Sequence, residues 1–188
     1  MKYFFYILVI ILLSRGFSFT QEMPVPVEIQ IPLFKKILTF DRNLKTRAGN
    51  EISIGILFQK GFKLSSDVKN AFVTTASPTH DSIVGLTVHI VALEYSDETN
   101  LKSNLLKHTI DILYITPMRA IDFKMVTQLT QAHKILTITG VPQYVENGIS
   151  VGLDIKAEKP QIIINLQSIK AEGADFSSKL LNLAKVIK

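Results

Sequence analysis

The residues of this 188-residue chain that could carry chemistry are few and widely separated. The chain contains no cysteine, which excludes disulfide bonds, thiolate zinc sites, cysteine nucleophiles and iron–sulfur clusters. The four histidines are too far apart to share a helical face at i, i+3 or i, i+4: His80, His89, His108 and His133. The spacing therefore excludes a helical zinc pair. A structural role for each histidine is preferred over a pair that converges at loop ends to bind metal or sense pH.

Several carboxylates could supply an acid/base pair, and Asp111 is the most informative because it lies in the apolar segment 110–115. Burial near a strand end would raise its pKa, as in many active sites. The preferred interpretation is an exposed strand start, with the carboxylate accepting from a neighbouring backbone N–H. Asn165 lies among isoleucines and is likewise either a functional polar group or a structural one. We expect the structural role, in which its side chain bonds the backbone of the following loop. The other acidic candidates are Glu94, Asp97, Glu98, Asp122 and Asp154.

Three common catalytic or nucleotide-binding motifs are missing from the sequence. The turn after the first predicted strand, residues 59–63, contains one glycine and no G-x-G-x-x-G pattern. There is also no G-x-x-x-x-G-K-[ST] loop and no G-x-S-x-G nucleophile elbow. We therefore predict no catalytic residue, no metal site and no cofactor.

The N-terminal segment reads as a secretory signal peptide over residues 1–20, cleaved near Thr20/Gln21. Lys2 precedes eleven apolar residues, 3–13, and Arg15 follows them. Eleven helical residues cover about 16 Å, roughly half of the ~30 Å hydrocarbon core, which favours an export signal over a spanning anchor. Removing this segment lowers the 21 basic residues to 19 against 16 acidic ones, so the net charge falls from +5 to +3. The small basic clusters are not interleaved with aromatic residues, so nucleic-acid binding is not predicted.

The mature chain, residues 21–188, is predicted to form a single domain in which strands and helices alternate. Prolines make residues 21–31 an extended lead-in, and Pro32 then opens a helix that ends near Asp41. Continuous apolar runs are typical of strands covered on both faces, and they occur at 52–58 and 110–115. Two further strands are predicted at 86–93, which is β-branched and apolar, and at 134–139. Helices are expected from Ser65-Ser66-Asp67 to Ser77-Pro78, around 101–106, and over 117–132.

After Gly140 the pattern changes from continuous to alternating. Alternation over 149–155 predicts a half-exposed strand, and a turn at 158–160 returns the chain into a strand over 161–166, forming an antiparallel hairpin at one sheet edge. A last helix, capped by Ser177-Ser178, is expected to cover the sheet up to Ile187. The predicted fold class is α/β: a three-layer sandwich with a mostly parallel sheet and a C-terminal antiparallel hairpin.

Four segments of the C-terminal third occur in an order typical of a known family: 135–138 (ILTI), 146–149 (ENGI), 162–166 (IIINL) and 176–184 (FSSKLLNLA). On these segments, and on earlier matches at 54–57 and 112–115, the chain resembles the YfiR family of secreted bacterial proteins over roughly residues 28–188. The shared residues are of structural types and so support the fold: Gly55, Gly148, Asn165, Ser177, Ser178, Leu180 and Leu181. The chain departs from the family at 39–42 and at Ile163, and it lacks the cysteine pairs of some members, so disulfide control is not carried over.

The resemblance implies a non-enzymatic periplasmic regulator that binds and restrains the periplasmic domain of an inner-membrane signalling protein. In the best-known case that partner is a diguanylate cyclase, which makes cyclic-di-GMP; a sensor kinase is the other candidate. We also expect dimerisation or partner contact through an apolar edge. The first helix is our candidate for the partner surface, through Phe34, Ile37 and Leu38.

Two other function classes remain open on the sequence. A periplasmic small-solute sensor would use the crevice at the carboxyl ends of the parallel strands, lined by 59–60, 94–97, 116–117 and 139–140. An exported enzyme would use Asp111 or a histidine. A deep polar pocket at those four loops would favour the sensor, whereas a filled crevice would count against it.

Overall fold

The structure is a computed structural model that describes residues 23–76 and 82–188. The predicted signal peptide and the predicted helix end at Ser77-Pro78 lie outside the described residues and stay predictions. The described strands form one eight-stranded sheet in the order β2-β3-β1-β4-β5-β6-β7-β8. They are β1 (Glu51–Phe58), β2 (Ser82–Ile83), β3 (Leu86–Glu94), β4 (Ile112–Ile115), β5 (Leu136–Thr139), β6 (Val151–Lys156), β7 (Lys159–Asn165) and β8 (Lys185–Ile187).

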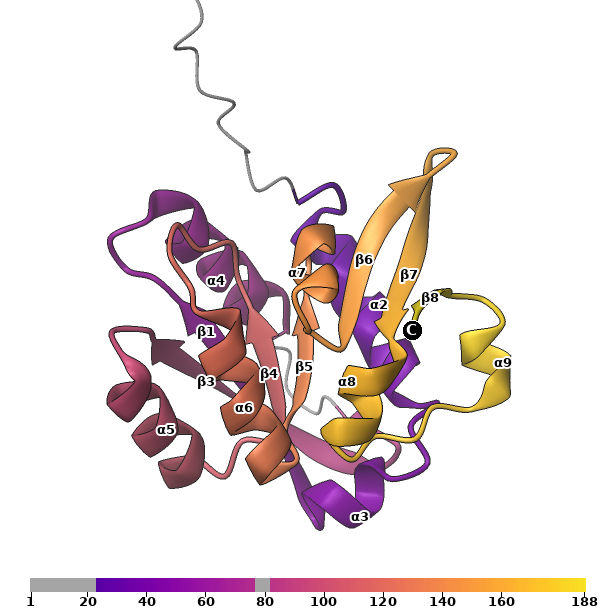
Figure 1. The fold of residues 1–188 in the computed structure, drawn as a ribbon, viewed down its shortest axis with the longest axis horizontal. Helices are drawn as coiled ribbons and strands as arrows, with labels where there is room; N and C mark the ends of the chain where they lie inside the picture. Colours follow the sequence, from indigo (N-terminus) through magenta and orange to yellow (C-terminus); the bar gives the residue numbers. More distant parts are fainter. Residues whose placement is uncertain (1–22, 77–81) are drawn as a thin grey trace, which may run out of the picture.

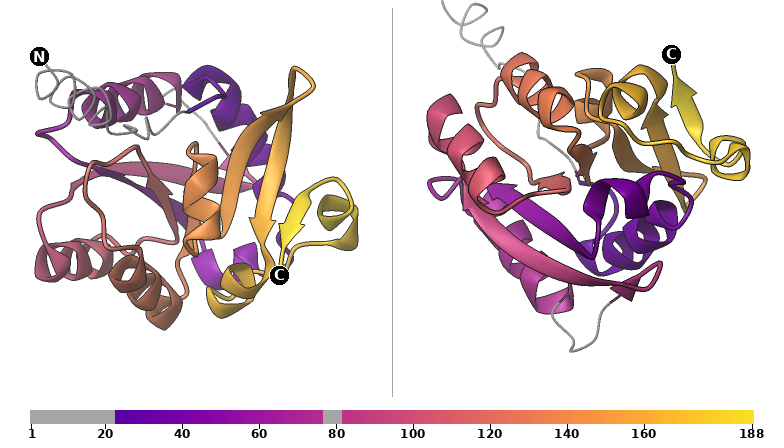
Figure 2. Two further views of the ribbon diagram at one scale, coloured as in Figure 1. Left: turned by 45° about the horizontal axis from the view of Figure 1, so that its top comes forward. Right: turned by 90° about the horizontal axis from the view of Figure 1, so that it is seen from below.

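Helices cover both faces of this sheet, as Figures 1 and 2 show. One apolar cluster joins α2 and α4 to one face, and a second joins α5, α6 and α7 to the other. The described helices are α2 (Val27–Leu38), α3 (Leu44–Ala48), α4 (Lys63–Ala76), α5 (Glu98–Lys107), α6 (Phe123–His133), α7 (Pro142–Glu146), α8 (Leu166–Ala171) and α9 (Ser178–Leu181). The predicted three-layer α/β fold is therefore confirmed.

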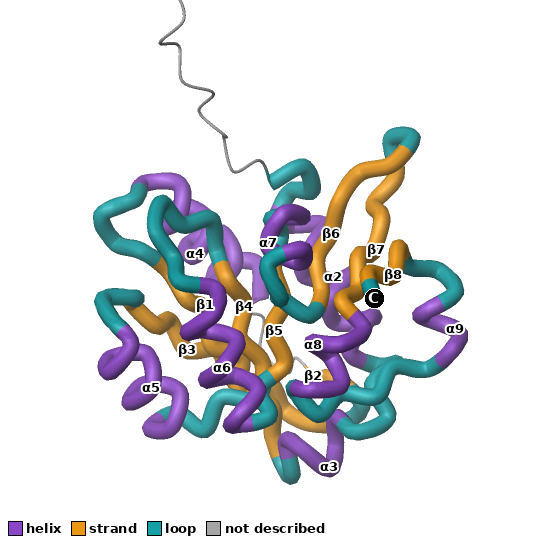
Figure 3. The backbone as a smooth tube through the Cα atoms, viewed as in Figure 1, coloured by secondary structure: helices purple, strands orange, loops and turns teal. Residues whose placement is uncertain are grey.

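The centre of the sheet is parallel and its two sides are mixed. Strands β3, β1, β4, β5 and β6 all run in one direction, while β2 is antiparallel to β3 and β7 is antiparallel to β6. β1 and β4 are apolar on both faces because each is covered by helices on both sides. The predicted β6–β7 hairpin is confirmed, and its exposed tip projects from the body of the protein (Figure 3).

The first helix differs from the prediction in its start. It begins at Val27, with Pro26 as N-cap, so residues 27–31 are helical and not an extended lead-in. Pro32 lies inside the helix on its exposed side, where water can bond the Glu28 carbonyl that lacks its i+4 donor. The earlier start is favoured because Val27, Ile31 and Phe34 recur at helical spacing and are all buried.

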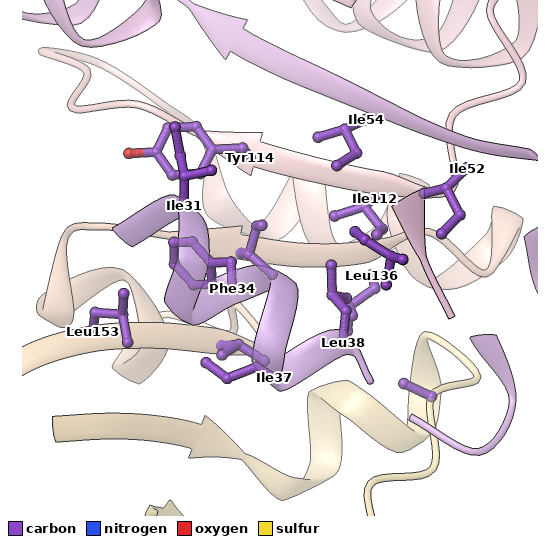
Figure 4. Packing of buried hydrophobic residues seen from close by; sticks show 14 of the residues in the cluster. Ile31, Phe34, Ile37, Leu38, Ile52, Ile54, Ile112, Tyr114, Leu136 and Leu153 are labelled. Carbon is purple, nitrogen blue, oxygen red and sulfur yellow. The ribbon is translucent and has the colours of Figure 1, made fainter. Parts of the chain in front are cut away.

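The buried face of α2 corrects the candidate partner surface. Phe34, Ile37 and Leu38 are only 2%, 2% and 1% exposed and pack on the sheet, as Figure 4 shows. The aromatic ring of Phe34 meets that of Tyr114 edge-on, with ring centroids 6.0 Å apart. These three side chains belong to the core, because a helix spacing of 3–4 residues points all of them at the same sheet face.

The other differences lie in the second half of the chain. Helix α6 begins at Phe123 and not near Pro117, because Asp122 caps it by accepting from the Met125 N–H at 3.0 Å. Helices α7 and α8 were not predicted; both are only five or six residues long. The predicted last helix stops at Leu181, and the chain then adds β8 beside β7, so the hairpin is not at the sheet edge.

Candidate functional site

The carboxyl ends of the parallel strands, where a small solute was the alternative expectation, are filled by side chains. Thr116, Met118, Thr139 and Val141 are all fully buried. The Thr116 hydroxyl donates to the Leu57 carbonyl at 2.9 Å and lies 2.6 Å from the Ser65 hydroxyl. Ser65 was expected to cap α4. It lies inside that helix, and its hydroxyl bonds the Thr116 hydroxyl instead.

Gln30 of α2 closes the centre of this region. Its side chain is fully buried, donates to the Val25 carbonyl at 2.6 Å and accepts from the Tyr114 hydroxyl at 2.9 Å. Gly140 lies directly against it, since a Cβ there would be 2.4 Å from the Gln30 amide nitrogen. Burial raises the pKa of Tyr114, so this hydroxyl stays protonated as a donor.

Tyr144 of α7 fills the part of this region beside Met118 with another buried, hydrogen-bonded side chain. Its hydroxyl accepts from the Met118 N–H at 2.9 Å, and its ring meets that of Phe123 with centroids 4.6 Å apart. Burial raises the pKa of Tyr144 to about 12. A crevice filled by Gln30, Ser65 and Tyr144 counts against the small-solute sensor.

A polar groove lies at the opposite, amino ends of β1 and β4. It has a volume of about 390 Å³ and is lined by Ala48, Asn50, Glu51, Ser53, Thr109 and Asp111. The Asp111 carboxylate accepts from the Ser53 N–H at 2.9 Å, which confirms the expected backbone bond. Burial raises the pKa of Asp111, and the nearby Arg47 and the bond to Ser53 oppose that change.

The wall behind this groove is held by a buried ion pair. Arg47 of α3 donates to the Asp41 carboxylate at 2.7 Å, and the two side chains are 10% and 0% exposed. Asp41 also accepts from the N–H groups of Asn43 and Asp175, at 3.0 and 2.9 Å. Arg47 in turn donates to the Lys134 carbonyl at 3.0 Å. The pair therefore joins the N-terminal third to both the α6–β5 turn and the C-terminal segment.

Glu172, which follows α8, is the most deeply buried carboxylate of the described residues, and it was not among the acidic candidates predicted from the sequence. It is fully buried and accepts from the Thr130 hydroxyl at 2.8 Å, the Thr137 N–H at 2.8 Å and the Ser150 hydroxyl at 2.5 Å. Its partners come from α6, from β5 and from Ser150, the residue before β6. Burial raises its pKa to about 7, and these bonds to the charged form limit the rise.

A signal for Glu172 was present in the sequence. Thr137 and Thr139 stand inside a short strand that is buried on both faces, where a hydroxyl needs a partner. The sequence pattern does not indicate that the partner of Thr137 is Glu172, 35 residues further along the chain. The carboxylate is enclosed by protein donors, which is a structural arrangement and not one that presents it to a substrate.

The glycine and asparagine positions singled out in the sequence all have structural roles. Gly55 lies under Leu93, and a Cβ there would be 2.8 Å from the Leu93 Cδ1. Gly148 has φ +101° and ends the turn after α7. Asn165 caps α8 by accepting from the Ser168 N–H at 3.1 Å and donates to the Val145 carbonyl at 3.2 Å. Asn165 was expected to bond the backbone of a following loop; the backbone that it bonds there is the first turn of α8.

The C-terminal positions fix the last segment to the N-terminal one. Ser177 is the N-cap residue of α9, although its hydroxyl makes no cap bond; its N–H donates to the Phe40 carbonyl at 3.1 Å. Ser178 begins the helix and is exposed, Leu180 is 1% exposed in the core, and Leu181 packs partly against it.

The described histidines and the remaining acidic candidates do not converge. His89 is exposed on β3, with its Nε2 3.0 Å from the Glu51 carboxylate, and His108 and His133 lie at the ends of α5 and α6. His80 lies outside the described residues. Asp97 caps α5 as Asp122 caps α6, and the pKa of Asp97 is lowered, chiefly by the bond from the Asn100 N–H. Within residues 23–76 and 82–188, no group of three or more His, Asp or Glu side chains could hold a metal ion.

Solved structures of similar fold come from several bacteria. A conserved domain protein of Vibrio cholerae O1 biovar El Tor is 16% identical with a TM-score of 0.54, covering 87% of this chain and 60% of that one. An ABC domain from Streptococcus pneumoniae in complex with L-Trp is 18% identical with a TM-score of 0.55, covering 81% and 60%. CD0873, a Clostridium difficile substrate-binding protein with adhesive properties, is 18% identical with a TM-score of 0.52, covering 78% and 57%.

These similarities define the class of protein to which the chain belongs: α/β proteins with a mostly parallel sheet between helices. The chain spans about 60% of the length of the first two structures, and identities this low show the fold alone. No curated protein matches the sequence.

The particular family is given by the match of residues 45–185 to the YfiR/HmsC-like family. The chain belongs to this family, as its resemblance predicted. The family is one of periplasmic, non-catalytic regulators. In the part of the chain that the structure describes, no helix combines the length and apolar character needed to cross a bilayer.

Proposed function

We propose that this chain is exported to the periplasm, loses residues 1–20, and acts there without catalysis. Its role is to bind and restrain the periplasmic domain of an inner-membrane signalling protein, a diguanylate cyclase or a sensor kinase. Membership of the YfiR/HmsC-like family over residues 45–185 is the observation that carries the proposal.

The geometry of the polar groups supports a binding role over an enzymatic one. Asp111 is bonded to the Ser53 N–H, Glu172 is enclosed by three hydroxyls and an N–H, and Tyr144 is bonded to Met118. Glu172 and Tyr144 are enclosed by the fold, and Asp111 lines the polar groove with its carboxylate already bonded to the Ser53 N–H.

With Phe34, Ile37 and Leu38 in the core, the exposed large apolar side chains become the candidates for partner contact. They are distributed over several elements: Ile29 (46% exposed), Leu64 (39%), Leu106 (51%), Ile155 (44%) and Leu183 (68%). Single isolated apolar residues on a surface are ordinary, so only a functional test identifies which of them matter.

The test combines genetics with capture. Deleting the gene should raise cyclic-di-GMP or the output of the kinase, and mature chain 21–188 carrying an affinity tag should capture one inner-membrane protein after crosslinking in cells. Mass spectrometry of the periplasmic fraction should find a chain that begins at Gln21.

Substitutions then locate the contact. Each of the five exposed apolar residues is changed singly to Glu, with Asn182→Glu as the exposed control beside Leu183. At least one apolar variant should lose both capture and restraint while the control keeps them. Unchanged signalling output after deletion, together with no membrane protein captured, contradicts the proposal.

A further inference from the structure

Among the described residues, strand β3 has a backbone edge that is unpaired over most of its length. It has nine residues, Leu86–Glu94, and pairs with β1 along nearly its whole length on one side. On the other side, β2 pairs only with Leu86 and Thr87. Among the described residues, no strand pairs with the outer side of β3 from Val88 to Glu94.

The direction of the free backbone groups follows from one hydrogen bond. The Tyr95 N–H donates to the Phe58 carbonyl of β1 at 2.8 Å. Because successive backbone groups of a strand alternate in direction, the odd-numbered residues of β3 bond to β1. The N–H and C=O groups of Val88, Ile90, Ala92 and Glu94 therefore point away from the sheet.

The side chains of this edge are those of a strand suited to pairing. The segment Val88–Glu94 reads VHIVALE and contains neither proline nor lysine, the residues that most often prevent edge pairing. Val88, Ile90 and Val91 are only partly buried, whereas the β1 residues beside them are almost all buried. Seven residues of this composition at an open edge are a ready template for another strand.

From this edge we infer that two copies of the chain associate by antiparallel pairing of β3 with β3, centred on Val91, to form one continuous sheet. In this register Val88 lies opposite Glu94 and Ile90 opposite Ala92 of the second copy. The four residues with outward backbone groups in one copy then form four hydrogen-bonded pairs with those of the other copy. Each pair exchanges two bonds, which gives about eight hydrogen bonds. The pairing ends at Val88, just before β2 begins to cover the edge.

The opposed side chains suit a second copy of this chain. Large Ile90 meets small Ala92 on the α2 and α4 side, and no two like charges face each other, because Glu94 is the only acidic or basic residue, histidine aside, in the segment. Glu94 lies opposite Val88, so the register contains no repulsive charge pair.

The inference names a surface for self-association and is independent of the membrane partner, because it is tested on purified chain 21–188. Sedimentation over a range of concentrations should show a dimer. Ala92→Lys places two lysines about 7 Å apart across the pair, and Ala92→Pro removes an outward N–H without breaking a bond to β1. Both variants should be monomeric, with the melting temperature that the natural protein shows at concentrations where it is a monomer. Ile155→Lys, on the distant hairpin, should remain a dimer.

Crosslinking tests the register, because the natural chain has no cysteine. Val91 faces its own copy in a non-hydrogen-bonded pair, whose Cα atoms lie about 4.5 Å apart, within the range for a disulfide. Val91→Cys should form a disulfide-linked dimer under mild oxidation, and Thr87→Cys should not. A monomer at every concentration, a dimer that survives Ala92→Lys, or crosslinking through Thr87→Cys but not Val91→Cys overturns the inference.

Discussion

The guanidinium of Arg47 lies 2.7 Å from the carboxylate of Asp41, and both side chains are almost completely removed from solvent. The same carboxylate accepts from the Asp175 N–H at 2.9 Å, 134 residues further along the chain. This pair therefore connects the two ends of the domain. An exposed pair, Lys63–Asp67 of α4, provides a comparison within the same molecule.

Breaking the buried pair should be far more costly than breaking the exposed one. Asp41→Asn leaves a buried guanidinium without its counter-charge, so we expect the free energy of unfolding to fall by about 3–5 kcal/mol. Asp67→Asn should change it by less than ~1 kcal/mol. Urea unfolding followed by circular dichroism measures both, and equal losses from the two substitutions would show that the buried pair has no special role.

Glu172 should make the stability of the protein depend on pH. Its pKa is about 7 in the folded protein, against 4.5 for a glutamate that is free in water. Between these values the folded state holds a proton that the unfolded state has released. Stability therefore decreases as pH rises from about 4.5 to about 7, by roughly 3 kcal/mol, and is level above that range.

Glu172→Gln tests this dependence, because the amide is nearly the same shape and does not titrate. The variant should lose most of the slope between about pH 5 and pH 7 and should equal or exceed the natural protein in stability at about pH 8. Glu146→Gln, an exposed residue on α7, should retain the natural slope. Urea midpoints measured at each pH unit give the dependence of stability on pH for each protein. If this dependence is unchanged in Glu172→Gln, it comes from other titratable groups.

Gly152 should not tolerate a side chain. It lies in β6 where α7 packs on the sheet, and a Cβ there would be 2.4 Å from a methyl group of Val145. Gly152→Ala is expected to destabilise the fold by about 1–3 kcal/mol through overpacking. Gly61→Ala is the matched control, since no atom lies within 4 Å of its Cβ position. Thermal unfolding of the two variants should differ by several degrees, and identical melting temperatures would contradict the close packing of α7.

Asn165 should stabilise through two separate bonds. Asn165→Ala removes the α8 cap and the bond to the Val145 carbonyl, with an expected cost of about 1–2 kcal/mol. Asn165→Ser keeps a cap acceptor and loses the amide donor, so its effect should be intermediate. Exposed Asn182→Ala is the control. A Ser variant as unstable as the Ala variant would mean that the Val145 bond, and not the cap, carries the effect.

The central part of the fold follows from the sequence because local patterns are strong there. The apolar runs that became β1 and β4 are continuous, and continuous apolarity has one common explanation in a chain of this size, a strand covered on both faces. The run that became β3 also forms a strand, but most of its side chains are partly or fully exposed. The β6–β7 hairpin was equally predictable, since the alternation of its strands and the turn at 158–160 are both local sequence features.

The termini of the domain were harder to predict because contacts between distant segments decide them. Residues 182–187 have a composition that suits a helix, yet Lys185, Val186 and Ile187 pair with β7. Helix α2 starts five residues before Pro32 because its buried side chains have a sheet face to cover. Local propensity is a weak preference that such tertiary contacts override.

By itself the sequence determined the α/β class, the missing thiol, nucleotide-binding and hydrolase motifs, and the family resemblance, all of which depend on residue type and short-range order. Only the tertiary structure decided which side chains are exposed and which polar groups meet. It placed Phe34, Ile37 and Leu38 in the core, brought Glu172 to Thr137 and Ser150, and left the outer side of β3 open among the described residues. The physical reason is that burial and long-range pairing depend on how the elements pack, and no local pattern records that arrangement.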